Sequence, residues 1–230
     1  MPLNKTKGNM FNFITHTWNP IKGACPFDCT YCFMKRWGDK RLKAPRLVKS
    51  EMKTDLEKNN FIFIGSSIDM FAPEIPEEWI THYVLTKAIG YENKYLLQSK
   101  NPMRYLKIHD DWLVPEKFIL STTLETNYYM PEIMRNSPPP IDRAVAMSRL
   151  PKEYKRMVTI EPIMKFNLDE LIKMIMLINP VQINIGADSC NKKLPEPDPA
   201  ELKYLIGVLE NLDSNIHLKF NLKRIINATN

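Results

Sequence analysis

Three cysteines crowd one short stretch of this sequence. Cys25, Cys29 and Cys32 lie within "GACPFDCTYCF", residues 23–33, with the spacing C-x3-C-x2-C. Thiolates this close together bind metals or carry out redox chemistry. The chain has four cysteines, and the remaining one, Cys190, lies far away in sequence. The chemistry of the stretch therefore depends on what three neighbouring thiols can do without an adjacent fourth.

Four kinds of chemistry fit these thiols. A dithiol redox motif needs only the pair in "CTYC" and leaves the third cysteine idle. A structural zinc site takes four ligands, and Cys190 or His16 would have to complete it. A conventional iron–sulfur electron carrier also takes four thiolates. In the fourth interpretation, three thiolates hold three irons of a 4Fe-4S cluster and leave one iron open to an external ligand, such as the amino and carboxylate groups of S-adenosylmethionine.

The composition indicates a globular protein with a basic surface. Of 230 residues 44% are hydrophobic, and 32 Lys and Arg against 26 Asp and Glu give a formal charge of +6. A denser basic patch spans residues 35–49. Such a charge favours a phosphate or nucleic-acid partner, although a solvated basic face explains it equally well. Without a signal-like or membrane-spanning apolar run, we expect a cytoplasmic protein with no membrane partner.

Short apolar runs alternate with amphipathic segments along the chain. The runs are too short for helices and too continuously apolar for half-exposed strands, which predicts buried parallel strands. These strands are expected at 11–17, 61–67, 94–99, 117–123, 156–162, 181–188 and 216–220, and helices at 76–90, 140–150, 167–178 and 198–212. The alternation predicts one α/β domain over residues 1–230. Six or seven units are too few for a closed eight-unit barrel, which leaves a partial barrel or an open doubly wound sheet.

Polar residues recur where the predicted strands end. The carboxyl ends of parallel strands meet at one edge of the sheet, and the loops that follow them build the site. Exposed strand ends are commonly polar in any case, which accounts for part of the set. The candidates at this edge are Asp69, Gln98, Ser99, Lys100, Thr122, Glu125, Glu161, Asp188, Lys219 and Asn221.

The cysteine loop follows the first predicted strand and has an aromatic residue, Tyr31, before its last cysteine. This pattern resembles the signature of the radical S-adenosylmethionine (radical SAM) superfamily. The resemblance implies a partial (β/α)6 TIM-like barrel, a 4Fe-4S cluster on Cys25, Cys29 and Cys32, S-adenosylmethionine as cofactor, and an external electron donor such as flavodoxin or ferredoxin.

Further segments extend the resemblance over nearly the whole chain. They include "THTWNPIKGACPFDCTYCF", "IGSSIDMFAPEIPEEWI", "YLLQSKNPMRY", "LSTTLETN", "VTIEPIM" and "INIGADS". In this order they look like a compact radical SAM family of largely unassigned function, also found in phages and distantly similar to spore photoproduct lyase. The resemblance also points to the queuosine lyase of queuine salvage.

The resemblance implies roles for individual cofactor-binding residues. The main chain near Tyr31 and Phe33 is expected to contact adenine. "GSS" occupies the place of a Gly-Gly-Glu motif that binds the methionine amine, but its glutamate is missing here. The amine would instead be bound by Ser66, Ser67 or Asp69, the methionine carboxylate by Lys100 with Gln98 and Ser99 beside it, the ribose by Thr122 and Glu125, and adenine by Ile185 and Gly186.

The same resemblance implies the reaction. A 5′-deoxyadenosyl radical would abstract hydrogen from a nucleoside or nucleotide, and the predicted reaction is cleavage of queuosine 5′-monophosphate to release queuine. Glu161 and Asp188 are the candidate catalytic residues, which would also hold the base. The residues His16, Trp18, Asn19 and Lys219 complete the predicted substrate pocket.

Two other functions remain open. One is radical modification or repair of a base in DNA, which would use the same cluster and bind nucleic acid in a salt-sensitive manner. The other is a zinc-stabilised nucleic-acid-binding module in which the three cysteines are structural. Cys190 has no role in these interpretations beyond that of a buried thiol or a radical relay.

Overall fold

The computed structural model describes residues 3–7, 10–38 and 43–228, so part of the basic patch 35–49 lies outside the described residues. An eight-stranded sheet, in the order β1-β2-β5-β6-β7-β8-β9-β10, forms its centre, and all neighbouring strands are parallel except β1 and β2. The strands are β1 (Asn4–Lys5), β2 (His16–Trp18), β5 (Phe61–Ile64), β6 (Lys94–Ser99), β7 (Phe118–Thr123), β8 (Lys155–Ile160), β9 (Gln182–Ile185) and β10 (Asn215–Leu218). A separate pair joins β3 (Ile21–Lys22) to β4 (Arg46–Leu47).

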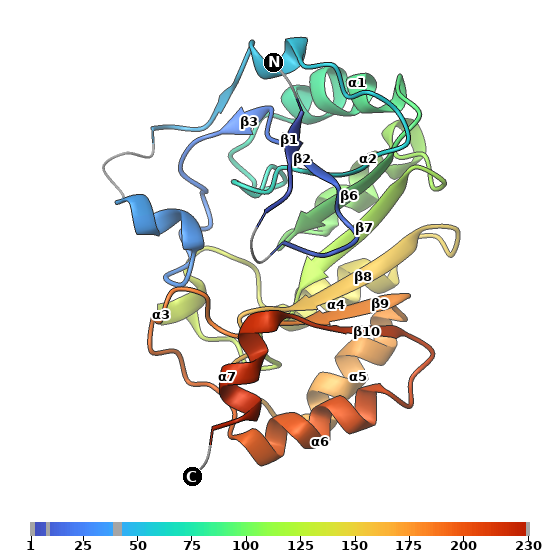
Figure 1. Ribbon diagram of the computed structural model, residues 1–230. Coiled ribbons are helices and arrows are strands. Elements are labelled where there is room, and N and C mark those ends of the chain that lie inside the picture. The colour runs from blue at the N-terminus through green and yellow to red at the C-terminus, as the bar shows by residue number, and fades with distance from the viewer. Residues whose placement is uncertain (1–2, 8–9, 39–42, 229–230) are drawn as a thin grey trace.

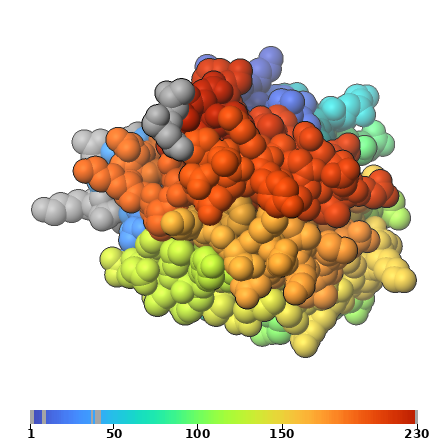
Figure 2. Space-filling model, turned by 90° about the horizontal axis from the view of Figure 1, so that it is seen from below, coloured from blue at the N-terminus to red at the C-terminus, as the bar shows by residue number. Residues whose placement is uncertain are grey.

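Helices connect the strands and cover the outside of the curving sheet (Figure 1). They are a π-helix at Trp79–Leu85 that runs into α1 (Thr86–Ile89), then α2 (Met103–Trp112), α3 (Pro131–Met134), α4 (Pro140–Ser148), α5 (Leu168–Ile178), α6 (Pro199–Leu209) and α7 (Lys223–Ile226), with 3₁₀ turns at Phe33–Trp37, Glu51–Lys53 and Phe220–Leu222. Figure 2 shows α5 and α6 closing one face of the molecule as a continuous surface. No described helix is long and apolar enough to cross a membrane.

The order of the strands decides between the two predicted architectures. The seven parallel strands follow one another in chain order, without the reversal that a doubly wound sheet requires. The fold is therefore a partial α/β barrel. All seven predicted strands are confirmed, although only the end of the 11–17 run pairs into the sheet, as β2. The four predicted helical regions are confirmed as well.

Local sequence signals explain where two of these helices begin. The side chain of Asn167 accepts a hydrogen bond from the amide of Glu170 at the start of α5. Asp198 and Glu201 form a reciprocal capping box at the start of α6, with a proline in its first turn. Such caps satisfy amide groups that have no partner inside the helix. The helix α2 was not predicted.

Alternate residues along the strands point to two environments, the outer core under the helices and the inside of the barrel. Ile62, Leu97 and Val158 belong to the large core between the sheet and the helices. Their neighbours on the opposite face, Phe63 and Leu96 among them, form a second, smaller apolar cluster with Phe11, Ile14 and Met157. Successive strand residues point to opposite faces. The inward-facing side chains are therefore apolar at one depth of the barrel, and Gln98 and Thr159, further along β6 and β8, make its next level polar.

Candidate functional site

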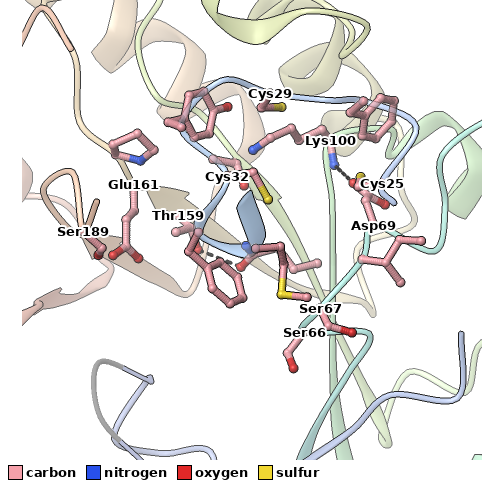
Figure 3. A pocket seen from close by; sticks show the side chains of 18 of the residues that line it. Cys25, Cys29, Cys32, Ser66, Ser67, Asp69, Lys100, Thr159, Glu161 and Ser189 are labelled. Carbon is pink, nitrogen blue, oxygen red and sulfur yellow. Dashed lines mark hydrogen bonds between the residues drawn. The ribbon is translucent and has the colours of Figure 1, made fainter. Parts of the chain in front are cut away.

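A cavity of about 830 Å³ opens at the carboxyl ends of the strands. It is lined by the cysteine loop on one side and by residues after β8, β9 and β10 on the other (Figure 3). Many of the residues singled out in the sequence meet here. The predicted site residues that line it are Cys25, Cys29, Tyr31, Cys32, Phe33, Ser66, Ser67, Asp69, Gln98, Ser99, Lys100, Glu161, Asp188 and Lys219.

The cysteine loop holds its three thiols through its own backbone turns. The amide of Asp28 donates to the carbonyl of Cys25 at 3.1 Å, and the amide of Cys32 donates to the carbonyl of Cys29 at 3.2 Å. Cys29 is buried, with its Sγ 3.5 Å from the carbonyl oxygen of Met134, whereas Cys25 and Cys32 are partly exposed. Local turns therefore present all three sulfurs to one cavity.

The Cys25 and Cys32 thiols are protonated in the metal-free protein. Burial, followed by the negative charge of Asp69, raises the pKa of Cys25 to about 12. Burial also raises the pKa of Cys32, against a smaller opposing effect of Lys100. Metal binding must therefore displace protons from these thiols, as thiolate ligation generally does. The nearby cation makes that deprotonation easier at Cys32.

The donor set fits a cluster with an open iron. Three thiols of one loop face a cavity with room for a further ligand. Among the described residues no three His, Cys, Asp or Glu side chains converge on a single metal ion. A four-iron cluster does not require such convergence, because each thiolate binds a different iron. The zinc alternatives, His16 and Cys190, do not line the cavity.

A buried ionic network lies behind the cysteine loop. Glu125 is fully buried and accepts hydrogen bonds from the Tyr31 hydroxyl, from Lys100 at 2.8 Å and from Arg143 at 2.8 Å. Burial opposes ionisation of Glu125, but the charges of Arg143 and Lys100 outweigh it and hold its pKa below the usual value. Both carboxylate oxygens are engaged and Glu125 does not line the cavity, so its contact with a cofactor ribose stays a prediction.

The segment after β5 is organised by two polar side chains. Asn19 Oδ1 accepts from the hydroxyls of Ser66 and Ser67, each at 3.1 Å, and from the Ser67 amide at 3.0 Å. Asn19 itself does not line the cavity, so it supports the two serines rather than contacting a ligand directly.

Asp69 has an equally complete set of partners. It accepts from the Ser99 hydroxyl at 2.8 Å, the Lys100 amide at 2.7 Å and the Phe71 amide at 3.0 Å. Burial raises the pKa of this carboxyl despite these bonds. Asp69 therefore joins the segment after β5 to the end of β6 and lies beside Cys25.

On the opposite side of the cavity, Glu161 and Lys219 form an ion pair at 2.7 Å. Asn221 Nδ2 lies 3.5 Å from the other Glu161 oxygen, and the Lys219 ammonium lies 4.8 Å from the ring centroid of Phe11. Gly186 passes so close that a Cβ there would lie 2.7 Å from Glu161 Cδ. Gly186 thus leaves the space that the Glu161 carboxylate occupies.

The Asp188 carboxylate binds the backbone of its own loop. Its two carboxylate oxygens accept from the amides of Cys190 and Lys192, and its amide donates to Glu196 at 3.2 Å. Arg224 binds Glu196 and reaches the Asp188 carbonyl at 3.2 Å. The Asp188 carboxylate therefore orders this loop at the cavity wall.

The side chains of four other predicted site residues lie outside the cavity lining. Trp18 is fully buried in the outer core and its indole donates to the Glu51 carbonyl at 3.1 Å. His16 is two residues earlier on the same strand, where its ring bonds Thr15 at 2.9 Å. Alternation likewise turns Ile185 into the outer core and Thr122 toward the Ser99 carbonyl, at 2.8 Å.

Sequence reasoning missed several residues of this region. Thr123 and Thr159 line the cavity, and strict alternation from Leu120 and Val158 would have selected them over Thr122. Arg143 had a weaker signal. It lies four residues before Met147 and three before Ala146, on the apolar face of a predicted helix, where an unpaired arginine would be costly. An arginine in that position requires a buried partner, which is Glu125.

No protein-family profile matches the chain, and no curated protein matches it. Solved structures do. A spore photoproduct lyase mutant with bound AdoMet and dinucleoside spore photoproduct aligns with a TM-score of 0.64 at 10% identity, over 92% of this chain and 78% of that one. A second spore photoproduct lyase mutant gives a TM-score of 0.62 at 10% identity, over 94% and 80%. The chain therefore shares the partial-barrel fold of these structures.

Proposed function

We propose that this protein is a radical SAM enzyme that acts on a nucleotide-type substrate. The observation that carries the proposal is that the C-x3-C-x2-C loop presents Cys25, Cys29 and Cys32 to one cavity at the strand ends. The fold adds support, since it matches an enzyme whose solved structure holds AdoMet. Three thiolates with an open fourth iron are what binding of that cofactor to a cluster requires.

The chain's own residues have distinct tasks in this proposal. When bound, the reduced cluster and S-adenosylmethionine supply a 5′-deoxyadenosyl radical, with the electron coming from a donor such as flavodoxin or ferredoxin. The three cysteines hold the cluster. Ser66 and Ser67, fixed by Asn19, offer hydroxyl oxygens to the cofactor amine.

The opposite wall would orient the substrate. Glu161 is a carboxylate that can accept hydrogen bonds from a base, and Lys219 can bind a phosphate or sugar oxygen. Both side chains line the cavity: Glu161 is partly exposed, at 17%, and Lys219 is largely buried, at 8%. A substrate can therefore reach both groups. Gln98 and Thr159, joined at 3.1 Å, add an uncharged polar pair deeper in the cavity.

For the substrate we propose queuosine 5′-monophosphate, cleaved to release queuine. The support is chemical: its cationic and hydrogen-bonding base suits Glu161, and its phosphate suits the basic residues of the cavity wall. Those basic residues are Lys7, Lys35, Arg36 and Lys219.

A second candidate is modification or repair of a base in DNA. It is favoured by the solved structure with a dinucleoside spore photoproduct, in which the bound substrate is a pair of linked nucleosides. The same cavity residues would then contact one base, and the basic residues would contact the backbone phosphates.

One experiment separates these candidates. Reduced protein is incubated anaerobically with S-adenosylmethionine and either queuosine 5′-monophosphate or ultraviolet-irradiated oligonucleotide, and 5′-deoxyadenosine is measured by chromatography. The Cys29→Ala variant is the control for background. We expect substrate-dependent 5′-deoxyadenosine and free queuine with queuosine 5′-monophosphate. Turnover with the oligonucleotide alone would reverse the order of the candidates, and colourless protein with one tightly bound zinc would contradict both.

A further inference from the structure

The buried network behind the cysteine loop carries unequal numbers of opposite charges. Lys100 binds one oxygen of Glu125 and Arg143 binds the other, each at 2.8 Å. Tyr31 adds an uncharged hydroxyl to the same carboxylate. Two cations therefore share one anion in a site where Glu125 and Arg143 are fully buried and the Lys100 side chain is 16% exposed.

Asp69, the second buried carboxylate of this region, does not pair with the surplus positive charge. Asp69 takes its hydrogen bonds from the Ser99 hydroxyl and from the amides of Phe71 and Lys100. None of these bonds uses the Lys100 ammonium, which is held by Glu125. The positive charge is thus directed to the Tyr31 side of the site, where the ammonium lies 5.3 Å from the centroid of the Tyr31 ring.

Arg143 makes the position of this charge rigid. Besides Glu125, its guanidinium donates to the Thr123 carbonyl at 3.0 Å, the Ser137 hydroxyl at 3.0 Å and the Pro138 carbonyl at 2.7 Å. It therefore fixes Glu125 against α4 and the loop that follows β7. Glu125 in turn fixes both Tyr31 and Lys100.

The Lys100 ammonium is aimed at the cysteines. Figure 3 shows its side chain reaching toward Cys29 and Cys32. The same ammonium lies 5.3 Å from the centroid of the Tyr31 ring, and Tyr31 immediately precedes Cys32. The 2.8 Å ion pair with Glu125 favours the charged form of this ammonium.

We propose that Lys100, held by Glu125 and Arg143, is a positioning residue that supplies the counter-charge for an iron–sulfur cluster on the cysteine loop. The inference rests on the proposed function. A thiolate-ligated cluster is anionic and gains a further negative charge on one-electron reduction. A buried cation beside it stabilises the reduced form more than the oxidised form, and so raises the reduction potential.

This role predicts opposite effects with and without the cluster. In cluster-free protein the surplus cation has no anion of its own, and a buried uncompensated charge is unfavourable. A Lys100→Met substitution leaves Glu125 and Arg143 as a balanced pair. It should therefore preserve or raise the thermal midpoint of cluster-free protein, while it lowers the reduction potential of the loaded protein.

The test compares four proteins: wild type, Lys100→Met, the charge-preserving Lys100→Arg, and Lys107→Met, which removes an exposed lysine on α2. Each is measured cluster-free for its thermal midpoint. Each is then reconstituted anaerobically with iron and sulfide and titrated with dithionite and redox mediators, without S-adenosylmethionine, while the reduced cluster is followed by electron paramagnetic resonance.

We expect Lys100→Met alone to have a more negative potential, with a cluster-free midpoint at or above that of wild type. A lower cluster-free midpoint with an unchanged potential would make Lys100 a structural residue and overturn the inference. An unchanged potential with weaker binding of S-adenosylmethionine would overturn it in favour of the predicted methionine-carboxylate contact. If wild type assembles no cluster, the proposed function itself fails, which is distinguishable from these results.

Discussion

The two sides of the cavity use charge in different ways. On the cysteine side, Glu125 and Arg143 are fully buried, and their bonds join the loop to β6, β7 and α4. On the opposite side, Glu161 is partly exposed, and its largely buried partner Lys219 lines the cavity beside it. Buried charges with complete partner sets hold a structure in place, whereas charges that a ligand can reach can exchange partners. In the proposed function, the first side would position the cofactor and the second would receive the substrate.

The largest difference between the sides is expected when each loses its central residue. Cys29→Ala should abolish iron binding and reduce 5′-deoxyadenosine formation to background, because two thiolates cannot hold the cluster. Glu161→Gln should retain wild-type iron content but lower substrate-dependent turnover by about 10²-fold, as loss of one orienting group typically does. Iron analysis and product chromatography on both variants check this. Equal iron loss in Cys29→Ala and Glu161→Gln would contradict the division of the cavity into an iron-binding side and a substrate side.

Removal of the buried carboxylate should strongly destabilise the cysteine side. Glu125→Gln leaves Lys100 and Arg143 without their anion, at a cost of about 3–5 kcal/mol in the free energy of unfolding. Urea unfolding of the cluster-free protein measures it. Glu132→Gln, an exposed carboxylate on α3, is the matched control and should change that free energy by less than about 0.5 kcal/mol.

The same carboxylate predicts an acid limb of stability. The folded-state pKa of Glu125 lies below its ordinary value of 4.5. Its contribution is therefore fully present above the unfolded pKa and is lost as pH falls toward the folded one. Between about pH 5 and pH 3, wild type should lose more unfolding free energy than Glu125→Gln. Parallel pH profiles for the two proteins would argue against an ionised Glu125.

On the substrate side, a single methyl group should displace the carboxylate without changing its charge. In Gly186→Ala the new Cβ would lie 2.7 Å from Glu161 Cδ, so the flexible Glu161 side chain must move. We expect kcat/KM to fall by about 10²-fold, since small misplacements have effects of that size.

The control for that substitution is Gly207→Ala. Gly207 lies inside α6, and an added Cβ meets nothing within 4 Å there. It should raise stability by about 0.5–1 kcal/mol and leave kcat/KM unchanged. Full activity in Gly186→Ala would show that the position of the Glu161 carboxylate does not matter for the reaction.

The smallest effects should distinguish neighbouring threonines on β7. Thr122→Val removes a buried hydrogen bond to the Ser99 carbonyl and should cost about 1 kcal/mol in stability with little change in KM. Thr123→Val changes a cavity-lining residue and should alter KM with a smaller loss of stability. Urea unfolding and steady-state kinetics check the pair. An identical response of both variants would contradict the assigned faces.

The sequence was sufficient to predict the fold because its signals are local. Continuous apolar runs and capped amphipathic segments predict the strands and helices, and their alternation predicts a parallel sheet. The three cysteines were found the same way, since their loop is one contiguous stretch. These local patterns alone leave a partial barrel and a doubly wound sheet open; the resemblance carried by the cysteine loop favours the partial barrel, and the observed strand order confirms it.

The rest of the site depends on long-range partners, which no local pattern specifies. The sequence selects Glu125 as a strand-end carboxylate but not its partner Arg143, which comes from a distant helix. Asp188 was chosen for the same reason, and its oxygens bind the backbone of its own loop. Trp18 lies in the outer core because of the strand face that it occupies.

The most direct test of the account is the metal content and spectrum of anaerobically purified, reconstituted protein, before and after addition of S-adenosylmethionine. The account predicts brown protein with about four irons per chain, absorbance near about 400 nm, and a reduced-state paramagnetic signal that changes when S-adenosylmethionine binds the open iron. Colourless protein with one tightly held zinc, or a cluster whose signal does not respond to S-adenosylmethionine, would contradict it.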